Sequence, residues 1–563
     1  MFYLYYCKSN DTPKIPSIVS IKSKTSSISS YEFDQGCIFF DEKSFNNVEQ
    51  NSDKLVLIDL FNAEYELDQA SSFNNIDSLR ETRILISNSR VKIKSDLFGS
   101  RPIYQYIDDQ LIIFASSMDL IEASVDKKLT IDPVLTILEC FSIKTSDKTS
   151  IKEIVRVPPS TEVTINGGKL EETDLFDLAF ITPDKVIKAP YWESLAYDRL
   201  RNILYKSCEN DKHHFVSLTA GYDSRLTFSL LPNKMGVSVK TWGDQTNADV
   251  IISQKLADIR ALPFNNKNNS ELMANLDENL INQLFKENLY SHNEIRHTFI
   301  MAALLKNWQS KTGNCLEFNS LGGELARSIY YGKCQTENDS DFYKQNNVYN
   351  LIDQLQSLKF FNKAFASKLK RRLSNNNVIP DTLTDPRVRE DYFNLRFRFG
   401  RGWSVRYRST QVCGSTLYPL MDPIFLYFCY KIPPELRQGS LLFKRMIYSA
   451  DKSLLDVDFN PHKKIPLLSK IMKRLNLKNA PVNYTYEQTL SRTVEQNLDK
   501  ITNNLSELYR TKESDVYFSH LFGSNIRDAI SIQKLQNIVM PNPLFRINST
   551  MQNLEKKFKD GII

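Results

Sequence analysis

Few of the residue patterns that mark metal centres, disulfide scaffolds or membrane proteins occur in this chain of 563 residues. Its eight cysteines form no Cys-x-x-Cys pair and its six histidines show no spacing typical of metal ligands, which disfavours zinc sites and disulfide frameworks. No apolar run approaches the ~18 residues of a membrane span, and the N-terminus lacks the basic stretch and apolar core of a signal peptide. We therefore expect a reduced, cytoplasmic protein without a membrane partner.

The chain also lacks a strong charge of either sign. Its 72 basic and 66 acidic residues are spread along the whole length and leave a net charge of +6, so no nucleic-acid partner is expected. With 41% hydrophobic residues, the chain is long enough for two or three domains with sizeable cores.

The first part of the chain reads as mostly strands. Up to about residue 175, short apolar runs such as 55–60, 111–115 and 162–165 alternate with turns rich in Asn, Asp, Ser and Gly. The segment Ile165-Asn-Gly-Gly-Lys169 is typical of a hairpin turn.

After about Ala189 the spacing of apolar residues changes. It favours a helix over 191–208, strands over 213–218 and 237–242, and mostly helices beyond. This alternation predicts an α/β region with a doubly wound parallel sheet in the middle of the chain.

The stretch Ser217-Leu-Thr-Ala-Gly-Tyr-Asp-Ser-Arg225 joins a predicted buried strand to a predicted helix. Gly221 permits a tight turn and a close backbone approach to a ligand, and Thr219 and Ser224 add hydroxyl groups. The start of the helix would direct free N–H groups and its positive dipole end at an anion. The segment therefore predicts a phosphate-binding loop, with an ordinary strand-turn-helix as the alternative.

This loop is not of the Walker type, because the Gly-x4-Gly-Lys-Ser/Thr pattern is absent. It resembles the Ser-Gly-Gly-x-Asp-Ser loop of ATP pyrophosphatases, with Thr219 and Ala220 in place of the first Ser and Gly. In that family the loop grips the β- and γ-phosphates and the aspartate helps hold magnesium. The resemblance implies ATP and Mg²⁺ as cofactors and the phosphate-binding residues Ser217, Leu218, Thr219, Ala220, Gly221, Tyr222, Asp223, Ser224 and Arg225.

Two earlier segments resemble the glutaminase domain of asparagine synthetases. They are Asp96-Leu-Phe-Gly-Ser-Arg-Pro-Ile-Tyr104 with the run after it, and Val157-Pro-Pro-Ser160. The resemblance implies an N-terminal α+β sandwich of the Ntn glutaminase type over 1–180 and an ATP-pyrophosphatase synthetase domain over 190–470. A helical C-terminal extension is expected over 471–563.

The resemblance continues downstream of the loop. It implies that Thr241, Trp242 and Gly243 border the nucleotide, and that Ser320-Leu-Gly-Gly-Glu324 is the counterpart of the family's Gly-Glu-Gly-x-Asp-Glu loop. That loop adds Gly322 and Gly323 to the phosphate site. Lysines that could stabilise the pyrophosphate leaving group are Lys444, Lys463 and Lys464, each with a solvated surface lysine as the alternative.

The acidic loop departs from the family pattern. If Glu324 aligns with the family's Asp, it is a metal ligand beside Asp223, and if it aligns with the following Glu, the Asp position is Gly323 and a ligand is lost. The structural alternative for Glu324 is a carboxylate at a helix start. Leu321 or Ser320 takes the place of the family's first Glu, the proposed base for an incoming amine, which disfavours asparagine-synthetase chemistry.

The N-terminus also departs from the pattern. Glutamine-hydrolysing members carry a cysteine at their second position, where Met removal exposes the amine that serves as base. Here the second residue is Phe2, and Cys7 lies inside an apolar run that reads as a strand. We therefore expect no glutaminase activity.

These features predict an AMP-forming ligase that adenylates a substrate carboxylate and forms an amide with an amine or ammonia. Members without the cysteine, the β-lactam synthetases and lasso-peptide cyclases, are the most similar in character. An asparagine synthetase or sugar-acid amidotransferase, and a non-catalytic binding or scaffold protein, are the alternatives. The expected partners are a small-molecule or peptide carboxylate and the nitrogen nucleophile, while a homodimer or a pathway partner protein is left open.

Overall fold

The computed structural model describes residues 2–8, 28–42, 45–60, 74–87, 90–125, 127–140, 146–209, 213–232, 236–243, 245, 247–267, 315–328, 352–353, 356, 363–374, 379–403 and 415–457. Lys463, Lys464 and the extension expected over 471–563 lie outside these ranges. None of the helices in the described ranges combines the length and apolar character needed to cross a bilayer.

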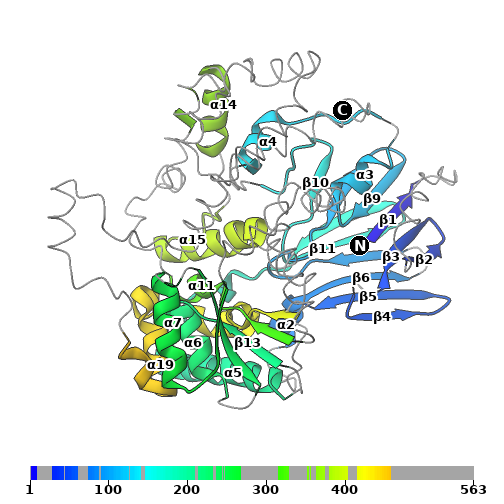
Figure 1. The fold of residues 1–563 in the computed structure, drawn as a ribbon. Helices are drawn as coiled ribbons and strands as arrows, with labels where there is room; N and C mark the ends of the chain where they lie inside the picture. The colour runs from blue at the N-terminus through cyan, green and yellow to red at the C-terminus, as the bar shows by residue number, and fades with distance from the viewer. Residues whose placement is uncertain are drawn as a thin grey trace.

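Two six-stranded antiparallel sheets form the first region, the blue and cyan strands of Figure 1. The first sheet has the order β10 (Ile154–Arg156), β8 (Tyr104–Ile107), β9 (Leu111–Ala115), β1 (Phe2–Cys7), β3 (Gly36–Asp41) and β2 (Ile28–Phe33). The second has the order β12 (Lys169–Asp174), β11 (Thr161–Asn166), β7 (Arg90–Lys94), β6 (Glu81–Ser87), β5 (Lys54–Leu60) and β4 (Asn47–Gln50).

Residues from both sheets form one core between them, since the side chains of a strand point alternately to its two faces. Phe2, Leu4 and Tyr6 of β1 meet their counterparts from the second sheet in this core. Those counterparts include Leu55, Leu57, Ile84, Ile86, Val91, Ile93, Val163 and Ile165. The apolar runs that predicted the strands thus supply the core of the sandwich.

The predicted hairpin at 165–169 is confirmed. Strands β11 and β12 pair from Thr161 with Asp174 to Asn166 with Lys169. Gly167 and Gly168 have φ values of +55° and +76°, the left-handed conformation that a two-residue turn of this type requires.

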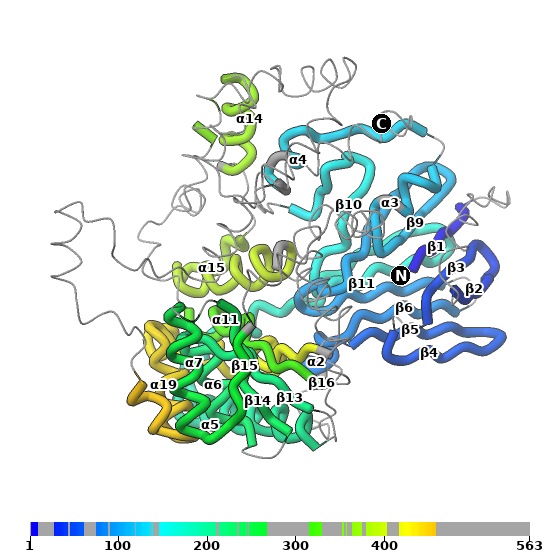
Figure 2. Tube along the Cα trace, in the orientation of Figure 1, coloured from blue at the N-terminus to red at the C-terminus, as the bar shows by residue number. Residues whose placement is uncertain are grey.

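A five-stranded parallel sheet forms the second region, with the order β15 (Phe264–Lys267), β14 (Val237–Trp242), β13 (His213–Ser217), β16 (Cys315–Phe318) and β17 (Ser415–Leu417). Figure 2 shows β13 to β16 grouped with α5 (Ala189–Ser207), α6 (Tyr222–Leu230) and α7 (Ala248–Ile259) around them. The expected mixture of an antiparallel part and a parallel sheet is confirmed. The predicted helix after β13 begins at Tyr222, directly after Gly221.

The remaining helices are mostly short. Those used below are α2 (Asn74–Asp77), α11 (Gly323–Arg327), α15 (Pro386–Phe393), the π-helix η5 (Asn394–Trp403), α17 (Pro423–Lys431), α19 (Leu441–Asp451) and η8 (Lys452–Leu455). The others are η3 (Ser78–Arg80), α3 (Met118–Glu122), α4 (Pro133–Cys140), η4 (Leu178–Phe180), α14 (Lys363–Ser374), η6 (Pro419–Met421), α18 (Pro434–Arg437) and η7 (Gln438–Ser440).

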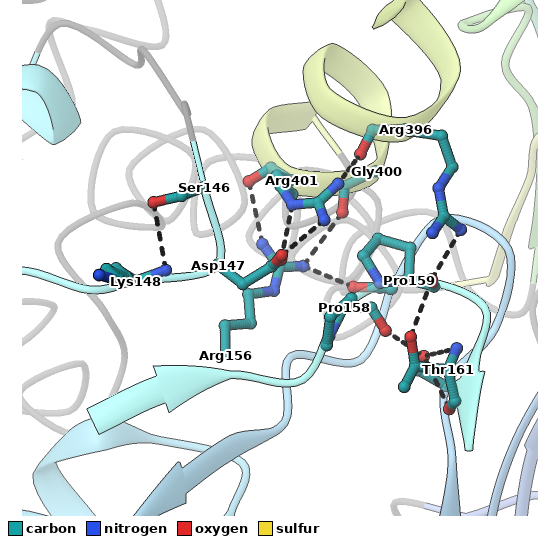
Figure 3. Close-up of polar contacts among 12 residues, drawn as sticks. Ser146, Asp147, Lys148, Arg156, Pro158, Pro159, Thr161, Arg396, Gly400 and Arg401 are labelled. Carbon is teal, nitrogen blue, oxygen red and sulfur yellow. Dashed lines mark hydrogen bonds and ion pairs between the residues drawn. The ribbon is translucent and has the colours of Figure 1, made fainter. Parts of the chain in front are cut away.

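The two regions meet through buried arginines. Arg156, at the end of β10, donates from Nη2 to the carbonyl oxygen of Gly99 at 2.8 Å and from Nη1 to that of Arg401 in η5 at 2.9 Å (Figure 3). Gly99 has φ +54°, and a Cβ there would lie 3.2 Å from Nη2 of Arg156. The glycine of the 96–104 motif therefore makes room for this contact.

Helix η5 contributes two arginines to the same junction (Figure 3). Arg401 contacts both carboxylate oxygens of Asp147 at 2.6 Å, and Arg396 donates to the carbonyl of Pro159 and to Asp174, both at 2.8 Å. Bidentate arginine-carboxylate pairs fix orientation as well as distance. The Pro-Pro segment and the π-helix thus hold the sandwich against the rest of the chain.

Candidate functional site

The loop 218–221 follows β13, the central strand of the parallel sheet. From β13 the chain proceeds to β14 and β15 on one side, while β16 lies on the other side. In such sheets, ligands bind at the carboxyl ends of the strands where the strand order reverses. Here that point lies between the loop after β13 and the segment 319–322 after β16.

The loop is shaped by its own hydroxyl groups. The Oγ of Ser224 accepts a hydrogen bond from the Thr219 N–H at 3.0 Å, and the Thr219 Oγ1 accepts one from the Gly221 N–H at 3.2 Å. The Ala220 N–H donates to Asp249 of α7 at 2.8 Å. These bonds connect the loop to the first turns of both α6 and α7.

The start of α6 keeps donors for a ligand. Among the described residues, the N–H groups of Asp223 and Ser224 have no hydrogen-bond acceptor, as expected for the first turn of a helix. Such donors, together with the positive end of the helix dipole, favour an anion. Phosphate binding by this loop stays a prediction.

The side chain of Asp223 is paired with Arg327, at the end of α11. The Arg327 Nη2 donates to Oδ2 at 2.7 Å, and its Nε lies 2.5 Å from Oδ1. Burial raises the pKa of the Asp223 carboxyl to about 6, because Arg327 offsets only part of the desolvation and the charge of Glu324 raises the pKa further.

Both glycines of the acidic loop are required by close contacts. A Cβ on Gly323 would lie 2.5 Å from Cγ of Asp223, and one on Gly322, which has φ +92°, would lie 2.3 Å from Cγ of Met421. Residue 323 therefore faces Asp223 and carries no side chain. Glu324 is partly exposed and close enough to Asp223 to influence its charge.

Two further predicted residues lie within α6 and next to it. The guanidinium of Arg225 is buried and donates to the carbonyl oxygens of Ala220, Leu454 and Val457 at 2.8–3.0 Å, so it connects the loop to η8. Lys444 of α19 is near the loop, with its Nζ 5.0 Å from the centre of the Tyr222 ring. Of the three predicted lysines, Lys444 is the one within the described ranges, and its role at this site stays a prediction.

The strands below the loop carry a buried ion pair. Lys240 of β14 and Glu317 of β16 approach to 2.9 Å, and the Ser217 hydroxyl donates to Glu317. The Leu218 side chain is buried, and its carbonyl accepts from the Thr241 hydroxyl at 2.9 Å. Hydrogen bonds of Ser217, Leu218 and Thr241 thus connect the start of the loop to the neighbouring strands.

Trp242 and Gly243 end the neighbouring strand at the same sheet edge. The Nζ of Lys240 lies 4.9 Å from the centre of the Trp242 ring, and Gly243 has φ +141°, with Asn247 3.0 Å from where its Cβ would be. The tertiary structure therefore brings 241–243 and 322–324 to the same edge as the loop.

The donor set does not fit magnesium. Both oxygens of Asp223 contact Arg327, and Gly323 supplies no carboxylate at the position that faces Asp223. Within the described ranges, no three His, Cys, Asp or Glu side chains come together as a metal site. A divalent cation at Asp223 would have to displace the arginine.

Sequence reasoning missed Arg327 and the role of Asp249 in holding the loop. One signal could have indicated Arg327: it lies four residues after Gly323, so the two positions share one face of α11. Where residue 323 has no side chain, the residue one turn later can reach Asp223.

The side chain at position 2, where a glutaminase carries its nucleophile, is packed in the core. Phe2 is fully buried between the two sheets, and its N–H donates to the Ser116 hydroxyl at 3.2 Å. Cys7 is buried at the end of the same strand, as predicted, and burial raises the pKa of its thiol. Neither residue resembles a nucleophile with access to substrate.

Comparison with known proteins finds no matching family model and no matching curated protein. Similar solved structures include the allosteric regulatory enzyme of purine biosynthesis, with a TM-score of 0.20 and 9% identity over 47% of this chain. They also include glutamine phosphoribosylpyrophosphate amidotransferase from B. subtilis, with a TM-score of 0.20 and 9% identity over 59% of this chain. The alignments cover 64% of the first structure and 78% of the second, and at these scores neither establishes a shared fold.

Proposed function

We propose that this protein binds ATP at the end of its parallel sheet and is an AMP-forming ligase that joins a carboxylate to an amine or ammonia. The observation that carries the proposal is the position of the loop 218–221 at the reversal of strand order. The loop is followed by the N–H groups of Asp223 and Ser224, which have no acceptor among the described residues. The adenylation of a carboxylate rests on the sequence resemblance to the asparagine synthetase family.

Each part of the proposed site would have its own role in binding ATP. The first turn of α6 would hold phosphate oxygens, Lys444 would add a cation beside Tyr222, and the segment 241–243 would border the nucleotide. Rate acceleration would come from holding the reacting groups in place and from stabilising the charge that develops on the phosphates. The nitrogen would come from an amine or free ammonia, because the first region offers a buried Phe2 where a glutaminase needs its nucleophile.

A non-catalytic nucleotide-binding protein is a second candidate, favoured by the pairing of Asp223 with Arg327. Incorporation of labelled pyrophosphate into ATP, measured with sets of candidate carboxylates, separates the two. Carboxylate-dependent exchange supports the ligase, and ATP binding without exchange for any carboxylate supports the second candidate. An absence of ATP binding by the full chain contradicts both.

Two serines of α6 provide a matched test of the loop. Ser224→Ala removes the hydroxyl that shapes the loop, whereas Ser229→Ala removes a hydroxyl that only bonds the Leu226 carbonyl within the helix. We expect S224A to weaken ATP binding about tenfold, the equivalent of one well-placed hydrogen bond, and S229A to leave it unchanged. Equal affinities in the two variants would place the nucleotide elsewhere.

A further inference from the structure

Asp223 lies where an anion would bind, yet both of its oxygens already contact a cation. Arg327 lies 2.5 Å from Oδ1 through Nε and donates to Oδ2 through Nη2 at 2.7 Å, and both side chains are four-fifths buried. A carboxylate beside an anion site needs a counter-ion, because two negative charges at short range repel strongly in a site of low dielectric.

The loop after β16 leaves no place for a second carboxylate at this point. Any side chain at residue 323 would collide with Asp223, since its Cβ would lie 2.5 Å from Cγ. Gly323 and Arg327 are one helical turn apart on α11, so the missing side chain and the added cation share one face. Helix α11 therefore excludes an acidic side chain at residue 323 and supplies the guanidinium of Arg327.

Arg327 is also held from its other side. Its Nη1 donates to the hydroxyl of Ser440 at 2.9 Å, and Ser440 is a buried residue with φ +64° immediately before α19. This helix carries Lys444, whose Nζ contacts the Tyr222 ring. The cation is therefore anchored between α6 and α19 and is not a free surface side chain.

We propose that Arg327, in place of a divalent cation, is the counter-ion of Asp223, and that it binds phosphate oxygens of a metal-free polyphosphate together with the start of α6. The phosphate part of this inference rests on the proposed function. Guanidinium groups bind phosphate and carboxylate oxygens at the same time through their planar set of donors. No proton is transferred and no covalent bond forms or breaks when Arg327 binds the phosphate oxygens.

Manganese binding tests the counter-ion role without any nucleotide. Electron paramagnetic resonance would count bound Mn²⁺ for the full-length wild type and Asp223→Asn. We expect the two forms to bind equally little Mn²⁺, because both oxygens of Asp223 contact Arg327 and Gly323 supplies no second carboxylate. A wild-type site that D223N removes overturns the inference.

Binding of inorganic pyrophosphate, measured by calorimetry in EDTA and in excess Mg²⁺, tests the phosphate role. We expect equal wild-type affinity in the two buffers, a loss of about tenfold or more in R327Q in EDTA, and a smaller loss in Arg327→Lys, which keeps the charge. Arg387→Gln, at an exposed arginine of α15, is the matched control and should match wild type. Wild-type binding that requires magnesium overturns the inference.

The two failures can be told apart. If no form binds pyrophosphate or ATP in either buffer, the proposed function and the phosphate role fall together. The manganese comparison then still decides whether Arg327 has taken the place of a metal at Asp223.

Discussion

The start of β1 in the sandwich and the end of β13 in the parallel sheet carry opposite kinds of residues. At the start of β1, position 2 carries a phenylalanine that is sealed between two sheets. At the end of β13, the chain keeps small and hydroxylic residues, a close approach at Gly323, and donors without acceptors among the described residues. The first region has the packing of a structural element, and the second has the polarity of a binding site.

The motif 96–104 of the sandwich makes several polar contacts. Asp96 accepts hydrogen bonds from Thr82 and Ser100, Arg101 pairs with Asp59 at 2.7 Å, and Gly99 makes room for Arg156. The contact through Gly99 and Arg156 joins this segment to η5. The motif 96–104 therefore contributes to the junction between the two regions.

The largest effect should come from breaking this junction. Arg401→Met leaves Asp147 without its bidentate partner, and removing one member of a buried pair costs about 3–5 kcal/mol. We expect calorimetry to show a lower unfolding temperature and separate transitions for the two regions. Arg387→Met, which breaks pairs that are about half exposed, should change stability by less than about 0.5 kcal/mol. A single transition near the wild-type temperature in R401M would show that the interface is not held by this arginine.

A nearly equal effect on stability is expected at the buried ion pair between β14 and β16. Lys240→Met leaves Glu317 buried without its cation, a loss of about 3–4 kcal/mol, whereas Lys240→Met with Glu317→Leu should recover most of it. Urea unfolding of the three forms measures both values. A loss in the double variant as large as that of Lys240→Met would mean that the unpaired Glu317 charge is not what destabilises the single variant.

A moderate effect is expected at position 2. Phe2→Cys should cost about 2–3 kcal/mol through the cavity that it leaves, and it should not create glutaminase activity, because the thiol would lie in the dry core. Thermal unfolding and glutamate release from glutamine measure the two results. Glutamate production by F2C would show that the end of β1 is open to substrate.

The smallest effect should appear in the pH dependence of stability. The raised pKa of Asp223 means that the unfolded chain releases its proton near pH 4 and the folded chain releases it near pH 6. As the pH rises from 4 to 6, wild type should therefore lose about 1–2 kcal/mol relative to Asp223→Asn, with no further change above pH 7. Thermal unfolding of both forms across this range measures the difference, and a constant difference would indicate an ordinary pKa.

Much of the fold follows from local patterns in the sequence. The short apolar runs of β5 and β11 predict strands, and Asn-Gly-Gly predicts the hairpin because few residues adopt a positive φ. The small residues after β13 likewise predict a turn. The Asp223–Arg327 pair could not be predicted in this way, since its members are 104 residues apart and meet only when α6 and α11 pack at one sheet edge.

The sequence by itself determined that this chain has an antiparallel first part, a parallel sheet and a glycine-containing loop between a strand and a helix, because each depends on neighbouring residues. Only the tertiary structure decided which charges surround that loop. It placed Arg327 on Asp223, left Gly323 no room for a side chain, and turned Arg225 toward η8. The physical reason is that burial and the distance between charges depend on how distant segments pack, and no local pattern encodes either quantity.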